Sequence, residues 1–221
     1  SYGTYLSFDD ADQMNYGLLN LLFPETPEGG YYSYFRTAPY GDIFDQIKPN
    51  VPGRGVDPRA LENYRLLVAM GGLSIDADLA AKLQDHVTRG GCLVVNVMEI
   101  SPALSAEFLG VDCTDEESEA GASVCACCGQ RFEEPVFPVR TIRPREGTEV
   151  LATTGDARPL ITRRQVGQGS VIVVAAKHLI ARDAEKTVPG NWMKKDLIRL
   201  TGHFMDHLVS GLLPVDVIIP E

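Results

Sequence analysis

The spacing of hydrophobic positions changes along this chain, and each change predicts a different kind of element. Residues 64–72, YRLLVAMGG, form a continuous apolar run ending in glycines, as expected for a parallel strand covered on both faces. Residues 74–91 open with Ser74 as an N-cap, repeat apolar residues four apart and close on a glycine pair, which predicts a helix. The run CLVVNVM, residues 92–98, predicts a second buried strand. Together they predict one βαβ unit.

A different pattern follows from about residue 112. Short apolar runs separated by Gly, Pro and charged turns predict antiparallel β structure, and its last run, residues 171–175, is apolar enough to return to the central sheet. The other predicted elements are a strand at residues 3–8, a helix at 9–23, a helix at 191–209 and a final strand at 213–219. The pattern therefore predicts one α/β domain over residues 1–221, with a β-rich insertion at about 112–170.

Composition excludes several classes of function. The 221 residues are 44% hydrophobic, enough to bury a core without disulfides or metals. The net charge is -10 and the 20 Lys and Arg residues are scattered, so we expect neither a nucleic-acid nor a membrane partner. The first residue is Ser1 rather than a methionine, and the last is Glu221, so we expect a piece of a longer polypeptide.

The run from residue 64 to 96 resembles the glutamine-amidotransferase-like domains attached to glycoside hydrolases such as family 42 β-galactosidases. The residues that carry the resemblance are Tyr64, Gly71, Lys82, Leu83, Val87, Gly90, Gly91, Leu93, Val94 and Val95. The resemblance implies a flavodoxin-like fold: a mostly parallel sheet with helices on both faces, here with a β-rich antiparallel insertion. It also implies a non-catalytic role, because the hydrolase-attached members generally lack activity.

Amidotransferase chemistry requires a cysteine on a tight strand-to-helix turn, near a histidine and an acid. The turn after the second predicted strand carries Asn96, Met98 and Glu99 instead. Cys92 begins that strand and should lie well over ~10 Å from the active edge, at ~3.3 Å of rise per residue. We therefore expect Cys92 to be buried and inert.

His178 lies just past the late apolar run. The resemblance places the catalytic histidine of the amidotransferase superfamily at about this position. Ligands of open α/β sheets bind beyond the carboxyl ends of strands, so Asn96, Glu99 and His178 are the candidate catalytic residues. Paired acids such as Glu133 and Glu134 are more typical of caps or solvated turns than of a glycosidase pair. The acidic run at residues 114–119 is predicted to be a solvated loop.

The cysteines leave three hypotheses open. Cys113, Cys125, Cys127 and Cys128 supply the four ligands of a zinc site but lack paired CxxC knuckles, and strand alternation would point Cys128 away from Cys125 and Cys127. A disulfide from Cys113 to one of the other three suits an exported protein. Reduced, partly buried thiols are the third alternative, because five is an odd count.

These observations favour a non-catalytic domain of a carbohydrate-active enzyme that packs against another domain or subunits of the same enzyme and helps to shape its active-site cleft. The parent protein is then a glycoside hydrolase, with no cofactor in this chain. One alternative is a stand-alone hydrolase that uses His178 with a carboxylate. Another is a module that binds carbohydrate through the aromatic cluster at residues 31–40. The sequence does not fix the compartment, although it slightly favours a periplasmic or extracellular one.

Overall fold

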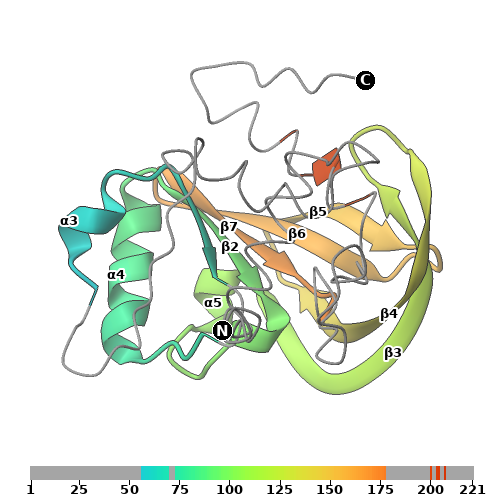
Figure 1. Cartoon of the computed structure of the whole chain (residues 1–221), viewed down its shortest axis with the longest axis horizontal. Coiled ribbons are helices and arrows are strands. Elements are labelled where there is room, and N and C mark those ends of the chain that lie inside the picture. The colour runs from blue at the N-terminus through green and yellow to red at the C-terminus, as the bar shows by residue number, and fades with distance from the viewer. Residues whose placement is uncertain (1–55, 70–72, 178–199, 201–202, 205–206, 208–221) are drawn as a thin grey trace, which may run out of the picture.

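A computed structural model describes residues 56–69 and 73–177, together with Leu200, His203, Phe204 and His207 (Figure 1). The predicted elements at residues 3–8, 9–23 and 213–219, the aromatic cluster at 31–40, and His178 lie outside the described residues. No described helix is long and apolar enough to cross a membrane.

The described chain is built mainly from strands. Its helices are α3 (Pro58–Leu61), α4 (Ala77–Thr88) and α5 (Ala106–Leu109), with a 3-10 turn, η3, at Val97–Glu99. Its strands are β1 (Leu66–Ala69), β2 (Cys92–Asn96), β3 (Val111–Cys125), β4 (Arg131–Pro144), β5 (Thr148–Thr154), β6 (Pro159–Val166) and β7 (Gly169–Val174).

All seven described strands join one mixed sheet in the order β1-β2-β7-β6-β5-β3-β4. β1, β2 and β7 are parallel, whereas every pairing from β7 to β4 is antiparallel. The expected flavodoxin-like fold, mostly parallel and covered by helices on both faces, is therefore wrong. The physical reason is connectivity: antiparallel strands can follow one another through short turns, so strands β3 to β7 require no crossover helices.

The predicted βαβ unit is confirmed as β1, α4 and β2. Leu66 to Ala69 pair in parallel register with Cys92 to Val95. The cap differs from the prediction: Asp76, rather than Ser74, is the N-cap, and its carboxylate accepts a 2.8 Å hydrogen bond from the backbone N–H of Leu79. Asp76 adopts extended backbone geometry at the residue before the helix, as an N-cap requires.

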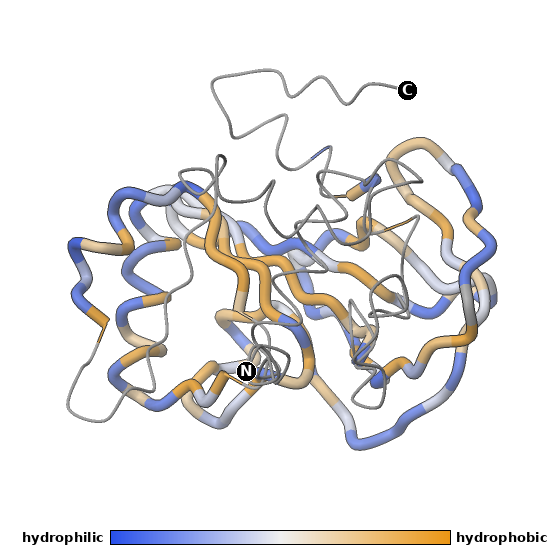
Figure 2. Tube along the Cα trace, in the orientation of Figure 1, coloured by the Kyte–Doolittle hydropathy of each residue, from blue (hydrophilic) through white to orange (hydrophobic). Residues whose placement is uncertain are grey.

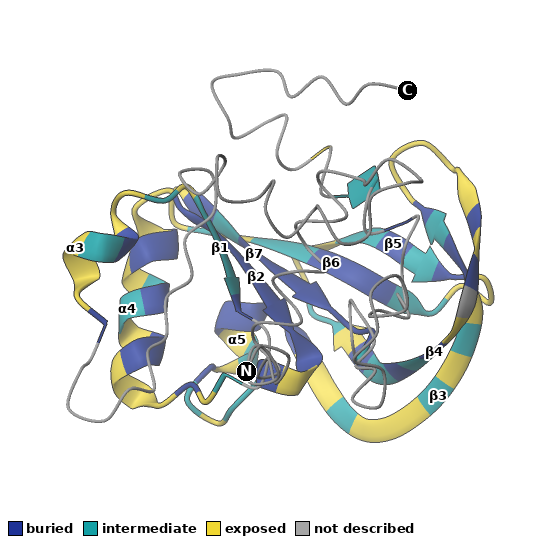
Figure 3. Ribbon diagram, in the orientation of Figure 1, coloured by how far each residue is buried: buried dark blue, intermediate teal, exposed yellow. Residues whose placement is uncertain are grey.

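The acidic run at residues 114–119 is not a loop, because it forms the outer part of β3. There β3 pairs with β4, placing Glu117 opposite Arg140. Glu117 also forms a 2.8 Å ion pair with Lys177, and Arg158 donates hydrogen bonds to Ser118 and to the backbone of Glu119. This curved strand is mostly exposed (Figure 3), so the prediction of a solvated face holds although the predicted loop does not.

The apolar core centres on β2 and β7. These two strands are buried over nearly their whole length and appear as hydrophobic segments in Figure 2. Helix α4 contacts both of them, whereas α5 contacts β3, β6 and β7. From the C-terminal part of the chain, Leu200 is buried in this core and Phe204 packs against it.

Candidate functional site

Three cysteine thiols meet at the turn between β3 and β4. Cys125 is the last residue of β3 and only 6% exposed, whereas Cys127 and Cys128 are exposed in the turn. The chain reverses here because the backbone N–H of Gly129 donates to the carbonyl of Cys125 over 2.9 Å and Gly129 adopts a φ of 70°. That left-handed geometry favours glycine. The turn breaks the strand alternation that would have pointed Cys128 away from the other thiols.

A histidine from a distant part of the sequence completes this group. The Sγ atoms of Cys125, Cys127 and Cys128 and a ring nitrogen of His203 all lie within 4.8 Å of one another. The Nε2 atom of His203 is 3.6 Å from the Sγ atom of Cys128, and the Sγ atoms of Cys125 and Cys127 are 2.8 Å apart. These four residues are called the cysteine–histidine cluster below.

Hydrogen bonding separates the acidities of two neighbouring thiols. Burial acts to raise the pKa of Cys125, but hydrogen bonds from the Cys127 side chain and from the backbones of Cys128 and Cys127 outweigh it and lower that pKa below 9.0. The same side-chain hydrogen bond, followed by desolvation and the nearby Cys125 charge, raises the pKa of Cys127 to about 11. Cys125 is therefore the more readily ionised of this pair, as suits the acceptor of several hydrogen bonds.

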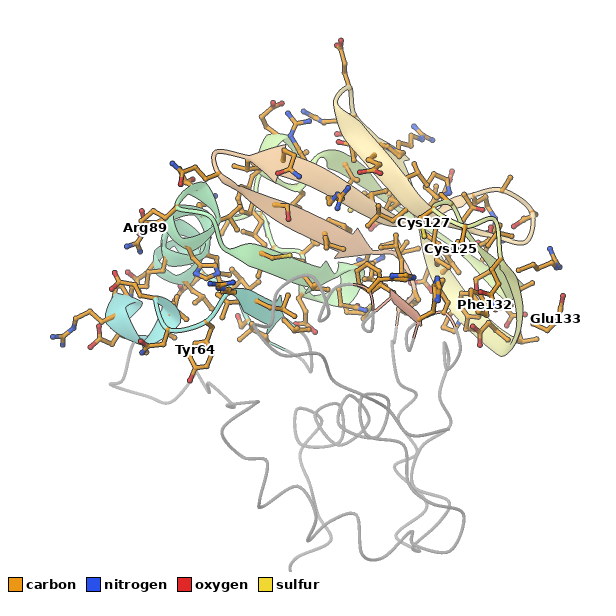
Figure 4. The ribbon with its side chains drawn as sticks, turned by 90° about the horizontal axis from the view of Figure 1, so that it is seen from above. Tyr64, Arg89, Cys125, Cys127, Phe132 and Glu133 are labelled. Atoms are coloured by element: carbon orange, nitrogen blue, oxygen red, sulfur yellow. The ribbon has the colours of Figure 1, made fainter. Side chains whose placement is uncertain are left out.

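Aromatic contacts position the histidine. The His203 ring lies 5.4 Å from the Phe132 ring, and its edge-to-face partner His207 is 4.4 Å away, both measured between ring centroids. Phe132 is buried in β4. Figure 4 shows Cys125, Cys127 and Phe132 together at the end of the molecule opposite Tyr64 and Arg89.

The structure keeps the fourth predicted cysteine apart from this cluster. Cys113 lies near the start of β3, opposite Ile142, twelve positions before Cys125 in the same strand. At ~3.3 Å of rise per residue a strand of that length separates its ends by tens of ångströms, far beyond the ~7 Å that a disulfide tolerates between Cα atoms. All five cysteines are free thiols in the structure.

At the carboxyl end of β2, Asn96 is 1% exposed and both polar atoms of its amide are hydrogen-bonded. Its Nδ2 atom donates to the carbonyl of Ala176 over 2.9 Å, and its Oδ1 atom accepts from the backbone N–H of Met98 over 2.9 Å. Asn96 thereby ties the end of β2 to the chain leaving β7. It caps η3 and presents no open amide to a ligand.

Glu99, the second candidate at this edge, is also buried, at the end of η3. His178 lies outside the described residues, so its relation to Asn96 and Glu99 stays a prediction. Cys92 is buried as expected, and desolvation raises the pKa of its thiol above 9.0. A thiol that is buried and hard to ionise is a poor nucleophile.

Sequence reasoning missed His203 as a partner of the cysteines. It lies 75 positions after Cys128, on the segment predicted as a helix at 191–209, and no short-range spacing links the two. The only available signal was chemical: a histidine on a predicted amphipathic helix can complete an incomplete cysteine set.

Comparison with known proteins finds similarity at the level of the fold. No family model and no curated protein matches the sequence. Among solved structures, the family 42 β-galactosidase Gan42B from G. stearothermophilus is 16% identical over 91% of this chain and 29% of that chain, with a TM-score of 0.51. The β-galactosidase from Rahnella sp. R3 is 16% identical over 72% of this chain and 25% of that chain, with a TM-score of 0.50. The mmIFT52 N-terminal domain is 15% identical over 89% of this chain and 96% of that domain, with a TM-score of 0.53.

The chain is thus similar in fold to a region of two glycoside hydrolases and to the mmIFT52 N-terminal domain. The chain spans less than a third of the length of the two β-galactosidases. The expected link to family 42 β-galactosidases is thus present as structural similarity, whereas the resemblance to glutamine-amidotransferase-like domains is not confirmed.

Proposed function

We propose that this chain is a non-catalytic domain of a carbohydrate-active enzyme and that it packs against another domain or subunit of that enzyme. The observation that carries the proposal is the state of Asn96. At the strand end where an amidotransferase nucleophile would stand, this residue is buried and both of its polar atoms serve the backbone. Such an arrangement stabilises a strand end and supplies no nucleophile at this position.

The fold comparisons support the enzyme context of this proposal. The similarity covers 91% of this chain but only 29% of a family 42 β-galactosidase, as expected if the chain corresponds to one domain of a larger enzyme. Catalysis would then belong to the rest of that enzyme. The alternative, a stand-alone hydrolase, requires His178 to act with a carboxylate of this chain, either Glu99 or an acidic neighbour.

The test is an activity assay on the isolated chain. Aryl glycosides and glutamine are offered separately, and the chain is compared with the variants Glu99→Gln and His178→Ala. We expect no turnover above background in any of the three. Turnover by the parental chain that both substitutions abolish would establish the stand-alone hydrolase and overturn the proposal.

The packing role is tested in the larger enzyme that the proposal assigns to this chain, called the full-length protein here. Amide hydrogen exchange is measured on the chain alone and within the full-length protein. We expect a contiguous surface of the chain to exchange more slowly in the full-length protein. Identical exchange in both states would mean that the domain does not pack against its neighbours.

A further inference from the structure

The cysteine–histidine cluster brings four metal-ligating side chains together from two distant parts of the sequence. Cys125, Cys127 and Cys128 come from the end of β3 and the turn after it, and His203 comes from the C-terminal part of the chain. No other group of three or more such side chains was found in the described residues. Nothing in the proposed packing role requires this convergence.

We propose that Cys125, Cys127, Cys128 and His203 form a structural Zn²⁺ site. Three thiolates and one imidazole are a standard ligand set for structural zinc, whereas Ca²⁺ and Mg²⁺ require oxygen ligands. Because all four tetrahedral positions are filled by protein atoms, no position is left for a substrate or a reactive water. The site therefore stabilises the structure and does not catalyse a reaction.

The spacing of the ligand atoms matches a tetrahedron around zinc. With Zn–S at about 2.3 Å and Zn–N at about 2.1 Å, the sulfur-to-nitrogen edge of a tetrahedron is about 3.6 Å. The distance between Cys128 Sγ and His203 Nε2 is 3.6 Å. The sulfur-to-sulfur edge should be about 3.8 Å, so the Cys125 and Cys127 thiols, 2.8 Å apart, must separate by about 1 Å when the metal enters. Cys127 can move because it is exposed in the turn.

The supporting residues hold the ligands from both sides. Gly129 closes the turn that brings the thiols together, and the backbone N–H of Cys125 donates to the backbone carbonyl of Gln130 over 2.9 Å. On the histidine side, Phe132 packs against the His203 ring. The Glu134 carboxylate accepts a buried 2.8 Å hydrogen bond from the backbone N–H of Leu200. A preorganised cluster of this kind lowers the cost of assembling a metal site.

Zinc bound here would fasten the C-terminal segment to the turn between β3 and β4. The metal would link Cys128 to His203, 75 positions apart. Binding requires the thiols to lose their protons to solvent, so affinity rises with pH. The inference is independent of the proposed packing role, because either can hold without the other.

The test starts with the full 221-residue chain, purified without chelators from medium that contains zinc, and counts bound metals by elemental mass spectrometry. We expect about one zinc per chain. Replacement by Co²⁺ should give the visible absorption bands of tetrahedral thiolate coordination. No retained metal together with no such bands would overturn the site, and stoichiometric iron or copper in place of zinc would overturn the assignment of the metal.

Matched variants separate the ligands from their neighbours. Cys128→Ser and His203→Gln should lower zinc affinity at least about tenfold, since loss of even an outer-shell partner costs 10–100-fold. Cys113→Ser is the control, because Cys113 lies elsewhere in β3 and outside the cluster. Equal zinc retention by the ligand variants and this control would overturn the ligand set.

Thiol counting distinguishes the zinc site from a disulfide. In denaturant with chelator and no reductant, a zinc site should release all five cysteines as titratable thiols. If only three react until reductant is added, a disulfide is present. If the two cysteines that react only after reduction belong to the cysteine–histidine cluster, the proposal is overturned.

Discussion

The carboxylate of Glu134, in β4, accepts a 2.8 Å hydrogen bond from the backbone N–H of Leu200, and both residues are buried. The bond joins residues 66 positions apart and satisfies a backbone donor that has been removed from water. A buried donor without an acceptor pays its full desolvation cost, so this contact helps to keep Leu200 in the core.

Replacing Glu134 tests the strength of this tether. Glu134→Ala removes the acceptor and should lower the free energy of unfolding by about 1–3 kcal/mol, whereas Glu134→Gln retains an acceptor oxygen and should cost clearly less. Urea unfolding of both variants and the parental chain measures the difference. Equal losses in the two variants would show that the hydrogen bond to Leu200 is not what Glu134 contributes.

Gly169, the first residue of β7, lies where the end of α4 and the connection that follows it leave no room for a side chain. A Cβ atom on Gly169 would lie 2.1 Å from the carbonyl oxygen of Gly91 and 2.3 Å from that of Val87. Both obstacles are backbone atoms that cannot rotate away. Gly169→Ala should therefore destabilise the fold by about 1–3 kcal/mol or more, as overpacking does.

The matched control is Gly121→Ala, also in a strand. There the nearest atoms to an added Cβ lie 3.9 Å and 4.0 Å away, and the backbone φ is not positive. Its effect should be close to neutral, because the substitution also restricts the unfolded chain. Thermal or urea unfolding compares the two, and a similar loss for both would argue against the close approach at Gly169.

Local elements of this fold could be predicted, but the arrangement of the strands could not. Helix α4 follows from apolar residues four positions apart, since its buried residues include Leu79, Leu83 and Val87. The acidic run at 114–119 carries no such signal. It becomes a strand because β4 places Arg140 beside Glu117, and that pairing depends on residues far away in the sequence.

The same limit applies to the candidate site. The cysteine pattern marked Cys125, Cys127 and Cys128 as potential ligands, yet strand alternation argued against them because the turn at Gly129 was not foreseen. Cys113 was grouped with them by proximity in sequence, whereas a strand keeps it apart. Packing on Phe132 and the hydrogen bond from Leu200 to Glu134 hold His203 near the group, and no local pattern specifies either tertiary contact.

His86 should make stability depend on pH. The residue is buried in α4, and its ring lies against Gly91, where an added Cβ would be 2.0 Å from Nε2. Burial, aided by the charge of Arg89 and opposed by Asp85, lowers the pKa of His86 below 6.5. The unfolded chain then binds a proton at this residue more readily than the folded chain does. The contribution of neutral His86 to the free energy of unfolding is therefore fully present above about pH 6.5. It is lost as the pH falls toward the lowered pKa of the folded chain.

The measurement is urea unfolding between about pH 7.5 and about pH 5, around the ordinary histidine pKa. His86→Gln cannot titrate, so this variant should lose less stability than the parental chain over that range, whatever its stability at the upper end. Parallel losses in both proteins would show that other groups govern the pH response.

Metal removal provides the last prediction, because a site that forms only in the folded chain must stabilise it by mass action. At free zinc 100-fold above the dissociation constant, one site adds about 2.7 kcal/mol to the free energy of unfolding. The melting temperature of the parental chain should therefore fall when a chelator removes the metal and recover when zinc is returned.

Cys113→Ser should show the same shift in melting temperature, since Cys113 lies outside the cysteine–histidine cluster. Cys128→Ser and His203→Gln should show a much smaller one. Differential scanning calorimetry with and without chelator measures all four proteins, and a chelator-induced shift that persists unchanged in Cys128→Ser and His203→Gln would place the stabilising metal elsewhere in the chain.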